Sequence, residues 1–203
     1  MSLSEEYRCS GHAVARGVLD AATLDRAERH LAGLVTTPTG VAACSPAHDD
    51  EARALGSDER VVGLARLVLD AEPELFGVSY LVKRAGDGLP VLWHQDGYPW
   101  REQLGVVDAV TLWVALDPAD QHNGCLRVVP GSHRLPLRPL RPNPVENVFG
   151  WECDPDLVDE SAAVDVVLAP GDVSLHHPAL LHSSGPNRSG GRRAALALRY
   201  RSA

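Results

Sequence analysis

The stretch FGVSYLVKRAGDGLPVLWHQD, residues 76–96, contains two β-prone runs, FGVSYLVKR and VLWH, separated by glycine, aspartate and proline. Strand-forming residues bounded by turn residues predict two short strands here. The second run leads into His94 and Asp96, which stand two positions apart. Side chains at i and i+2 project to one face of a strand, and the short spacing favours shared coordination of a metal ion even at a strand end.

Further β-prone runs follow this stretch, and two helical patterns precede it. Residues 20–35 and 58–70 carry apolar side chains at helical spacing, with Asp20 as a candidate N-cap. Residues 36–56, rich in Thr, Pro, Gly and Ala, are expected to form a loop. The later runs are AVTLWVALD (109–117), CLRVVPG (125–131), AVDVVLAPGD (163–172), VSLHH (173–177) and RAALALRYR (193–201). Helices followed by strands predict a mainly β (α+β) fold and not alternating βαβ units.

The length of the chain bounds its domain organisation. A chain of 203 residues can bury one sizeable core, and a second full domain would be a tight fit. We therefore expect a single domain over residues 1–203, with a helical part over about 1–72 and a β core over about 73–203. The segment 134–161 contains five prolines and is expected to form a long ordered loop or lid, because long loops within compact domains are often functional.

Composition narrows the classes of partner. The net charge is -8, and nucleic acid binding normally needs a basic surface, so we expect no nucleic acid partner. No run reaches the ~18 apolar residues of a membrane span. The start, MSLSEEYRCSG, is too polar for a signal peptide, and the four cysteines form no C-x-x-C pair. These features predict a reduced, soluble, cytoplasmic protein and leave the oligomeric state open.

A third metal ligand is available in GDVSLHHPALLHSSGPN, residues 171–187, which offers His176, His177 and His182. Two histidines and one carboxylate on one face of a metal form the facial triad of non-haem Fe(II) oxygenases. Zinc also accepts two histidines and a carboxylate, so a zinc hydrolase is an alternative interpretation. The H-x-D triplet alone is a weak signal because it arises by chance in many proteins.

Three motifs in order resemble the phytanoyl-CoA dioxygenase family. They are WHQD (93–96), LWVALDPADQHNGCLRVVPGSH (112–133) and LLHSSGPNRSGGRR (180–193), within a resemblance that covers roughly residues 76–203. The resemblance implies a double-stranded β-helix, a jelly-roll or cupin-like fold of two facing sheets, with the N-terminal helices packed on the outside.

The resemblance also implies a set of iron ligands. They would be His94, Asp96 and His182, with His177 as a pocket or neighbouring residue and His176 packed in the core or facing solvent.

The same resemblance implies a 2-oxoglutarate site. The family places an arginine eleven residues after the last iron-binding histidine, and Arg193 stands there, with Arg192 as the fallback. A guanidinium group suits the distal carboxylate because its planar fork can donate two hydrogen bonds. Ser184, Lys83 and Trp113 match other positions of the cosubstrate pocket.

The function implied is that of an Fe(II)- and 2-oxoglutarate-dependent dioxygenase that uses O2 to hydroxylate or cyclise a small metabolite or natural-product intermediate. Tyr98, Trp100 and Arg101 follow the H-x-D triplet closely and are expected to line the substrate pocket, with Phe149 and Trp151 folding over it. The alternative from another class is a non-catalytic jelly-roll protein that binds a metal or a small molecule. Intact ligand positions argue against that alternative.

Overall fold

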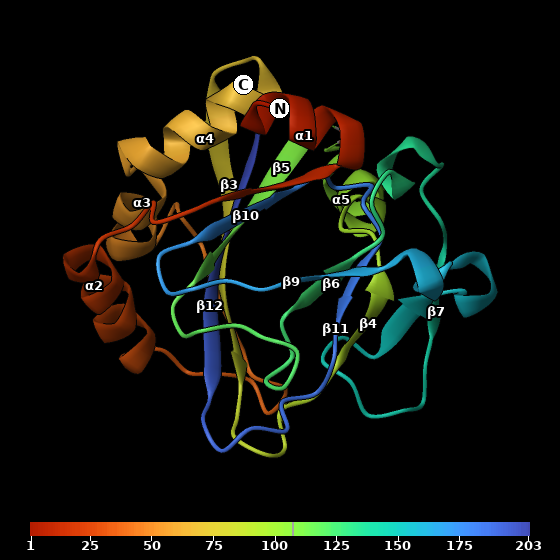
Figure 1. Cartoon of the computed structure of the whole chain (residues 1–203). Coiled ribbons are helices and arrows are strands. Elements are labelled where there is room, and N and C mark those ends of the chain that lie inside the picture. The colour runs from red at the N-terminus through yellow and green to blue at the C-terminus, as the bar shows by residue number, and fades with distance from the viewer. Residues whose placement is uncertain (107) are drawn as a thin grey trace.

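The fold is that of a computed structural model, which describes residues 1–106 and 108–203. In this part of the chain two antiparallel sheets face each other, and helices cover the outer face of the larger sheet (Figure 1). The helices are α1 (Leu3–Ser10), α2 (Ala21–Ala32), α3 (Asp50–Gly56), α4 (Glu59–Leu69) and α5 (Gly97–Leu104). Short 3₁₀ helices span Ser132–Arg134, Pro155–Leu157 and Glu160–Ala162.

The larger sheet has the strand order β1-β10-β5-β12-β3-β2, and the smaller has the order β4-β11-β6-β9. The larger sheet comprises β1 (His12–Ala15), β10 (Val173–His176), β5 (Ala109–Ala115), β12 (Arg193–Ser202), β3 (Pro73–Lys83) and β2 (Val41–Cys44). The smaller comprises β4 (Val91–His94), β11 (His182–Ser184), β6 (Leu126–Val128) and β9 (Val164–Val166). This two-sheet arrangement confirms the predicted jelly-roll fold.

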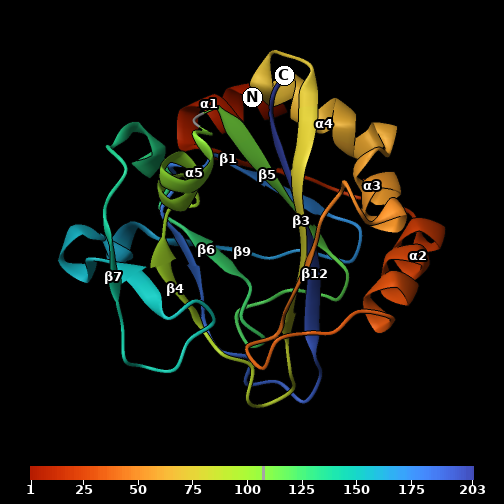
Figure 2. The ribbon, with the colours of Figure 1, turned by 180° about the vertical axis from the view of Figure 1, so that it is seen from behind.

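Strand alternation in the larger sheet separates two apolar cores. On β5, Leu112 and Val114 face the helices, whereas Trp113 and Ala115 face the smaller sheet. The outer core includes Leu31 of α2 and receives the apolar faces of helices α1 to α4, which Figure 2 shows from behind. Removing such side chains from water contributes about 1.5–3 kcal/mol each to folding. The inner core joins the two sheets and leaves room for a cavity at its polar end.

The two predicted helices are present with the expected start signal. Helix α2 begins after Asp20, whose side chain accepts a hydrogen bond from the backbone N–H of Thr23, and α4 lies within residues 58–70. The expectation of a loop over 36–56 is wrong in part, because this segment contains β2 and α3. Asp49 caps α3 by accepting from the N–H of Ala52.

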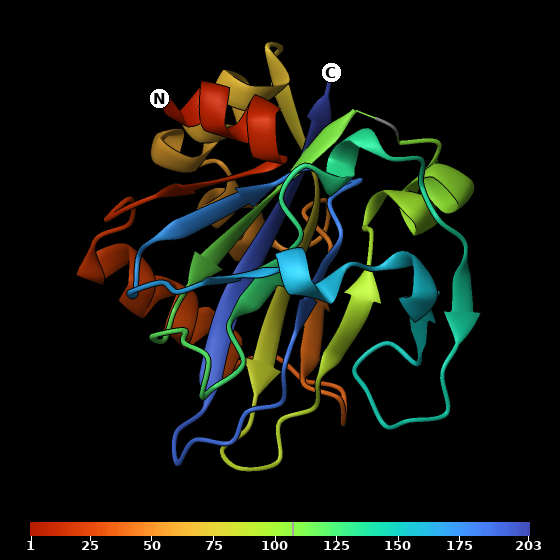
Figure 3. The ribbon, with the colours of Figure 1, turned by 45° about the vertical axis from the view of Figure 1, so that its right-hand side comes forward.

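The N-terminal part was expected to be helical, but it also contains strands. Strands β1 and β2 both come from it, and they form the two edges of the larger sheet. Both chain ends lie at the same end of the molecule, at the top of Figure 3. None of the helices in the described ranges is long and apolar enough to cross a membrane.

The proline-rich segment 134–161 is ordered, as predicted. It contains the hairpin of β7 (Leu140–Pro142) and β8 (Trp151–Cys153), which lies beside the smaller sheet, on the side away from α2 and α3 (Figure 1). The rings of Phe149 and Trp151 stack at a centroid distance of 4.9 Å. Both rings meet the edge of His94, at 5.5 and 5.4 Å. The segment therefore packs against the predicted metal-binding region.

Candidate active site

Two histidines lie directly opposite each other on the smaller sheet. His94 ends β4 and His182 begins β11, and the two residues are partners in the antiparallel register. Their ring centroids are 4.0 Å apart. The strand pairing thus brings together two residues that are distant in sequence.

The hydrogen bonds of these rings orient them. The Nδ1 atoms of His94 and His182 lie 2.8 and 3.0 Å from the carbonyl oxygens of Leu92 and Leu180. A carbonyl oxygen can only accept, so each Nδ1 carries a proton, and Nε2 is the nitrogen left to face the cluster. This is the arrangement that metal-binding histidines usually have.

The carboxylate of Asp96 lies beside the two histidines, but strand alternation does not place it there. Strand β4 ends at His94, and Asp96 has helical backbone angles at the start of α5. The intervening Gln95 is buried and points elsewhere, donating to the carbonyl of Ala179 and accepting from the N–H of Arg138. These two bonds hold the turn that carries Asp96.

The two carboxylate oxygens of Asp96 have different neighbours. Oδ1 faces the Nε2 atoms of His94 and His182, at 3.5 and 3.8 Å. Oδ2 accepts a 3.0 Å hydrogen bond from the hydroxyl of Thr111 and lies 3.7 Å from Nε2 of His176. One oxygen is therefore held in place from the larger sheet, and the other is turned toward the two histidines.

Charge and burial act in opposite directions on this cluster. Burial raises the pKa of Asp96, but His176, His182 and His94 lower it more, so its pKa lies well below the usual range. Burial, together with the charge of His94, holds the pKa of His182 well below its usual value. The ionised carboxylate and the neutral imidazole are the forms that bind metals. Ligand atoms of His94, Asp96 and His182 all lie within 4.8 Å of one another, as a shared ion requires.

A cavity of about 590 Å³, counting its open mouth, connects this cluster to a second polar group. Arg193, Lys83, Ser184 and Trp113 all line it, whereas Arg192 lies outside and pairs with acidic side chains. The guanidinium group of Arg193 lies over the ring of Trp113, 5.2 Å from its centroid. The residues expected to bind the cosubstrate are thus brought together in one cavity with the cluster.

Arg193 is a buried cation without an ionic partner. The residue is 2% exposed, its Nε atom has no hydrogen-bond partner, and no carboxylate of the described residues forms an ion pair with it. Burial lowers its pKa to about 10. Burying an unpaired charge is costly, so the site is complementary to an anion that enters the cavity.

Three of the residues expected to contact the substrate lie elsewhere. Tyr98, Trp100 and Arg101 belong to α5 and are not on the wall of this cavity. The ring of Trp100 packs on Phe76, and Arg101 points into solvent beside Glu102. A helix begins directly after Asp96, so these side chains lie off the cavity wall, although the ring of Trp100 lies 5.9 Å from the guanidinium carbon of Arg199, which lines it.

Arg199 lines the cavity but was not singled out from the sequence; it stands six residues beyond Arg193 on the same face of β12. His176 was expected in the core or facing solvent; it is buried, and it lines the cavity. His177, expected near the pocket, instead packs beside Tyr7 and His133. Alternation along β12 is the signal that could have identified Arg199.

Comparison with known proteins gives the family. The family model described as phytanoyl-CoA dioxygenase (PhyH) matches residues 7–195, nearly the whole chain. This chain belongs to the phytanoyl-CoA dioxygenase family. The resemblance noted in the sequence is thereby confirmed.

Curated relatives in this family are much longer proteins. Peroxisomal phytanoyl-CoA dioxygenase of Bos taurus is 33% identical over 117 residues, which cover 53% of this chain and 32% of the relative. The chain thus spans about a third of the length of the first curated relatives it matches.

Solved structures of the same fold are similar over almost the whole chain. EvdO2 from Micromonospora carbonacea var. aurantiaca, complexed with 2-oxoglutarate, aligns with a TM-score of 0.81 and 25% identity, covering 99% of this chain and 90% of EvdO2. The epimerase SnoN, in complex with Fe³⁺, α-ketoglutarate and nogalamycin RO, aligns with a TM-score of 0.76 and 27% identity, covering 99% of this chain and 82% of SnoN.

Proposed function

We propose that this chain is an Fe(II)- and 2-oxoglutarate-dependent oxygenase that hydroxylates or cyclises a small metabolite. The observation that carries the proposal is the unpaired guanidinium group of Arg193, which shares a cavity with His94, Asp96 and His182. A metal cluster alone would fit several chemistries. The buried cation beside it adds a place for the distal carboxylate of a 2-oxo acid.

His94, Asp96 and His182 are the proposed ligands of Fe(II). Two imidazoles and one carboxylate suit this ion, and the cavity would leave its other positions open. The chemistry supplied by such a centre is O2-dependent oxidation of a C–H bond, coupled to decarboxylation of 2-oxoglutarate to succinate and CO2. Thr111 donates a hydrogen bond to the far oxygen of Asp96 and so orients the carboxylate.

Arg193, Ser184, Lys83 and Trp113 are the proposed cosubstrate site. Arg193 would bind the distal carboxylate of 2-oxoglutarate, with Ser184 as a further hydrogen-bond donor and the ring of Trp113 supporting the guanidinium group. The Lys83 amino group donates to the carbonyl oxygens of Leu89 and Ser184, at 2.8 and 3.3 Å, and to that of Gly185. Its proposed role is to take up a proton when the anion binds and so to add positive charge at this end of the cavity.

The substrate class follows from a second arginine. Arg199 lines the cavity and is half-buried, its Nη1 donates to the hydroxyl of Ser79 at 2.8 Å, and no carboxylate among the described residues pairs with it. It lies beside Thr111 in the β12–β5 register, at the end of the cavity near Asp96. We propose that Arg199 binds an anionic group of a small polar metabolite, such as the carboxylate of an amino acid derivative.

Residues 1–203 are proposed to form one oxygenase domain. The β12 strand pairs with β3 and β5 at the centre of the larger sheet, and the edge strands come from the N-terminal part, so the segments share one sheet. All four cysteines in the described ranges are free. Free thiols suit a reducing compartment, which supports a cytoplasmic location.

The alternatives explain less of the cavity. A zinc hydrolase needs no anion site, so it would leave the buried Arg193 without a role. A non-catalytic binding protein would have no need to hold Asp96 from one side while turning its other oxygen toward His94 and His182. The oxygenase uses both features.

The test is an anaerobic titration of purified protein with Fe(II) and then 2-oxoglutarate, followed by visible absorption. We expect a weak metal-to-ligand charge-transfer band, which reports bidentate 2-oxo acid on iron. His182→Ala should abolish the band, and the neighbouring His176→Ala should retain it. Folded, iron-loaded protein without the band would contradict the proposed function, and the reverse result for the two variants would move the third ligand to His176.

A further inference from the structure

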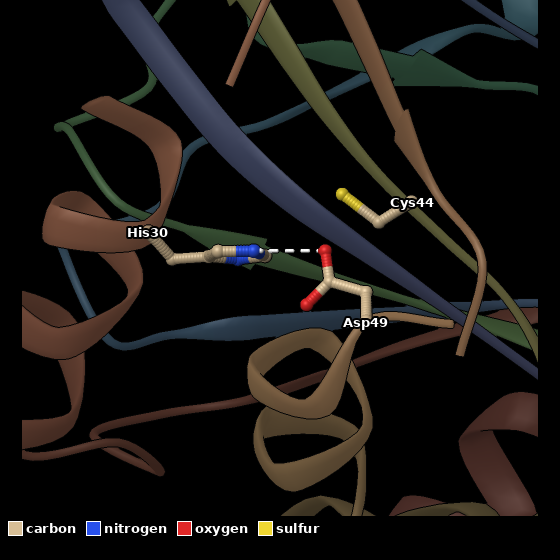
Figure 4. A group of neighbouring side chains, drawn as sticks. All are labelled: His30, Cys44 and Asp49. Atoms are coloured by element: carbon tan, nitrogen blue, oxygen red, sulfur yellow. Dashed lines mark hydrogen bonds and ion pairs between the residues drawn. The ribbon is translucent and has the colours of Figure 1, made fainter. Parts of the chain in front are cut away.

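A second group of metal-binding side chains lies outside the cavity, between the helices and the larger sheet. His30 comes from α2, Cys44 from the end of β2, and Asp49 from the position that caps α3. One ligand atom from each lies within 4.8 Å of the others. Figure 4 shows the imidazole, the thiol and the carboxylate converging from three separate elements.

The contacts of His30 and Asp49 leave one atom of each directed at this point. Nδ1 of His30 lies 2.9 Å from the hydroxyl of Tyr80, and its Nε2 lies 3.0 Å from Oδ2 of Asp49. Oδ1 of Asp49 is occupied by the N–H of Ala52, at 2.8 Å. A histidine whose other nitrogen is held by a hydrogen bond, beside a carboxylate held in the same way, resembles the supporting contacts of protein metal sites.

The donor set indicates which ions would bind. A thiolate, an imidazole and a carboxylate are ligands of Zn(II) and related borderline-soft divalent ions. His30 and Asp49 retain 11% and 22% side-chain exposure, so water can reach a fourth position. We propose that His30, Cys44 and Asp49 form a second metal site, for Zn(II) or a similar thiophilic divalent ion, that fastens α2 and α3 to the larger sheet.

Metal binding at this site would displace the thiol proton to solvent, because only the thiolate is an effective ligand. Burial, aided by the charge of Asp49, raises the pKa of Cys44 to about 11. The affinity for the ion should therefore increase with pH. Without a metal, the same residues form a hydrogen-bonded chain from Tyr80 through His30 to Asp49, so the test must separate the two roles.

Co(II) is a suitable probe because a cobalt–thiolate bond gives an intense near-ultraviolet charge-transfer band. The proposed iron site has no cysteine, so Co(II) bound there cannot produce this band. We expect wild-type protein, reduced and freed of metal, to bind two equivalents of Co(II) and to show the band. Cys44→Ser should lose the band and one equivalent of Co(II). Cys9→Ser, Cys125→Ser and Cys153→Ser are the matched controls and should retain both.

Two further variants test the geometry without removing the fold. Asp49→Asn keeps a helix cap, since asparagine caps as well as aspartate. This variant should bind Co(II) more weakly at this site, and its circular dichroism should show that the helix content is unchanged. Tyr80→Phe should lower the affinity for Co(II) roughly 10-fold, the usual effect of losing a supporting hydrogen bond. The thiolate band should still form once the site is filled. Zn(II) should raise the melting temperature of wild-type protein more than that of Cys44→Ser.

A single equivalent of Co(II) with no thiolate band, or a band that survives in Cys44→Ser, would overturn the second site and leave a hydrogen-bonded structural cluster. Neither result would affect the charge-transfer band of iron with 2-oxoglutarate. The two proposals can therefore fail separately.

Discussion

Lys83 and Arg193 are directly paired across β3 and β12, so two buried cationic residues lie side by side at one end of the cavity. Like charges repel, and burial adds to the cost of each. The pKa of Lys83 is lowered to about 6 by burial and by the charge of Arg193. An anion that binds at this end of the cavity would offset the repulsion between the two residues and stabilise the charged form of each.

Arg193→Leu should weaken 2-oxoglutarate binding while sparing Fe(II). Hydrogen bonds to a charged group are worth about 1.5–3 kcal/mol, which corresponds to a loss of roughly 10- to 100-fold. Anaerobic titration of the charge-transfer band measures this affinity. Arg192→Leu is the matched control, because Arg192 pairs outside the cavity with Glu28 and Asp117. Equal losses in both variants would argue against the assignment.

The affinity for 2-oxoglutarate should fall as pH rises above about 6, the pKa of Lys83 in the folded protein. Above that pH the amine is neutral, whereas the bound carboxylate favours the ammonium form, so binding takes up a proton. In Lys83→Met this dependence should disappear. Isothermal titration in buffers of different ionisation enthalpy measures the proton uptake, and identical pH profiles for the two proteins would refute the role of Lys83.

The same lysine predicts a trend in stability. Its pKa is near 10.5 when unfolded and about 6 when folded, so the unfolded chain binds more protons between these values. The free energy of unfolding contributed by Lys83 should therefore increase with pH across this window. Denaturant unfolding of metal-free wild type and Lys83→Met, compared at several pH values, isolates the contribution. A difference between the proteins that stays constant with pH would contradict it.

Thr111→Val should weaken Fe(II) binding roughly 10-fold, the usual effect of losing a supporting contact. The variant preserves shape but removes the hydroxyl that donates to Oδ2 of Asp96. Competition against a chelator measures the affinity. Thr111→Ser keeps the donor and should restore binding, whereas a weakness shared by both variants would point to packing.

Arg199→Met should leave the affinity for 2-oxoglutarate unchanged and remove the response to anionic substrates. Small acids that perturb the charge-transfer band of the wild-type complex should bind roughly 10- to 100-fold more weakly to the variant. The corresponding amides serve as neutral controls. If Arg199→Met weakens 2-oxoglutarate itself, Arg199 belongs to the cosubstrate site.

The sequence was most informative where the candidate residues lie within short motifs. The family resemblance of these motifs singled out His94, Asp96, His182 and Arg193, and the structure places all four on the wall of one cavity. The fold class followed from turn-bounded strands. Alternation along β12 already places Arg193, Ala195, Ala197 and Arg199 on one face, so the second arginine was available to the same argument.

Other features depended on tertiary pairing. The pair His176–His177 is ambiguous by itself, and the choice between them is made by the β10–β5 register, which sets His176 beside Thr111. Tyr98 and Trp100 were expected at the pocket because they follow the H-x-D triplet closely, but α5 begins at Gly97 and places both off the cavity wall. Strand β2 has only four residues, too few for a clear alternating pattern.

Strands β1 and β2 protect the two edges of the larger sheet. A variant that lacks residues 1–49 would uncover β10 and the part of β3, residues 78–81, that pairs with β2, and leave their backbone N–H and C=O groups free to pair with another molecule. It would also remove His12, the register partner of His176. We would therefore expect such a shortened protein to aggregate before it loses iron, and the N-terminal segment to act as the barrier that keeps this sheet from polymerising.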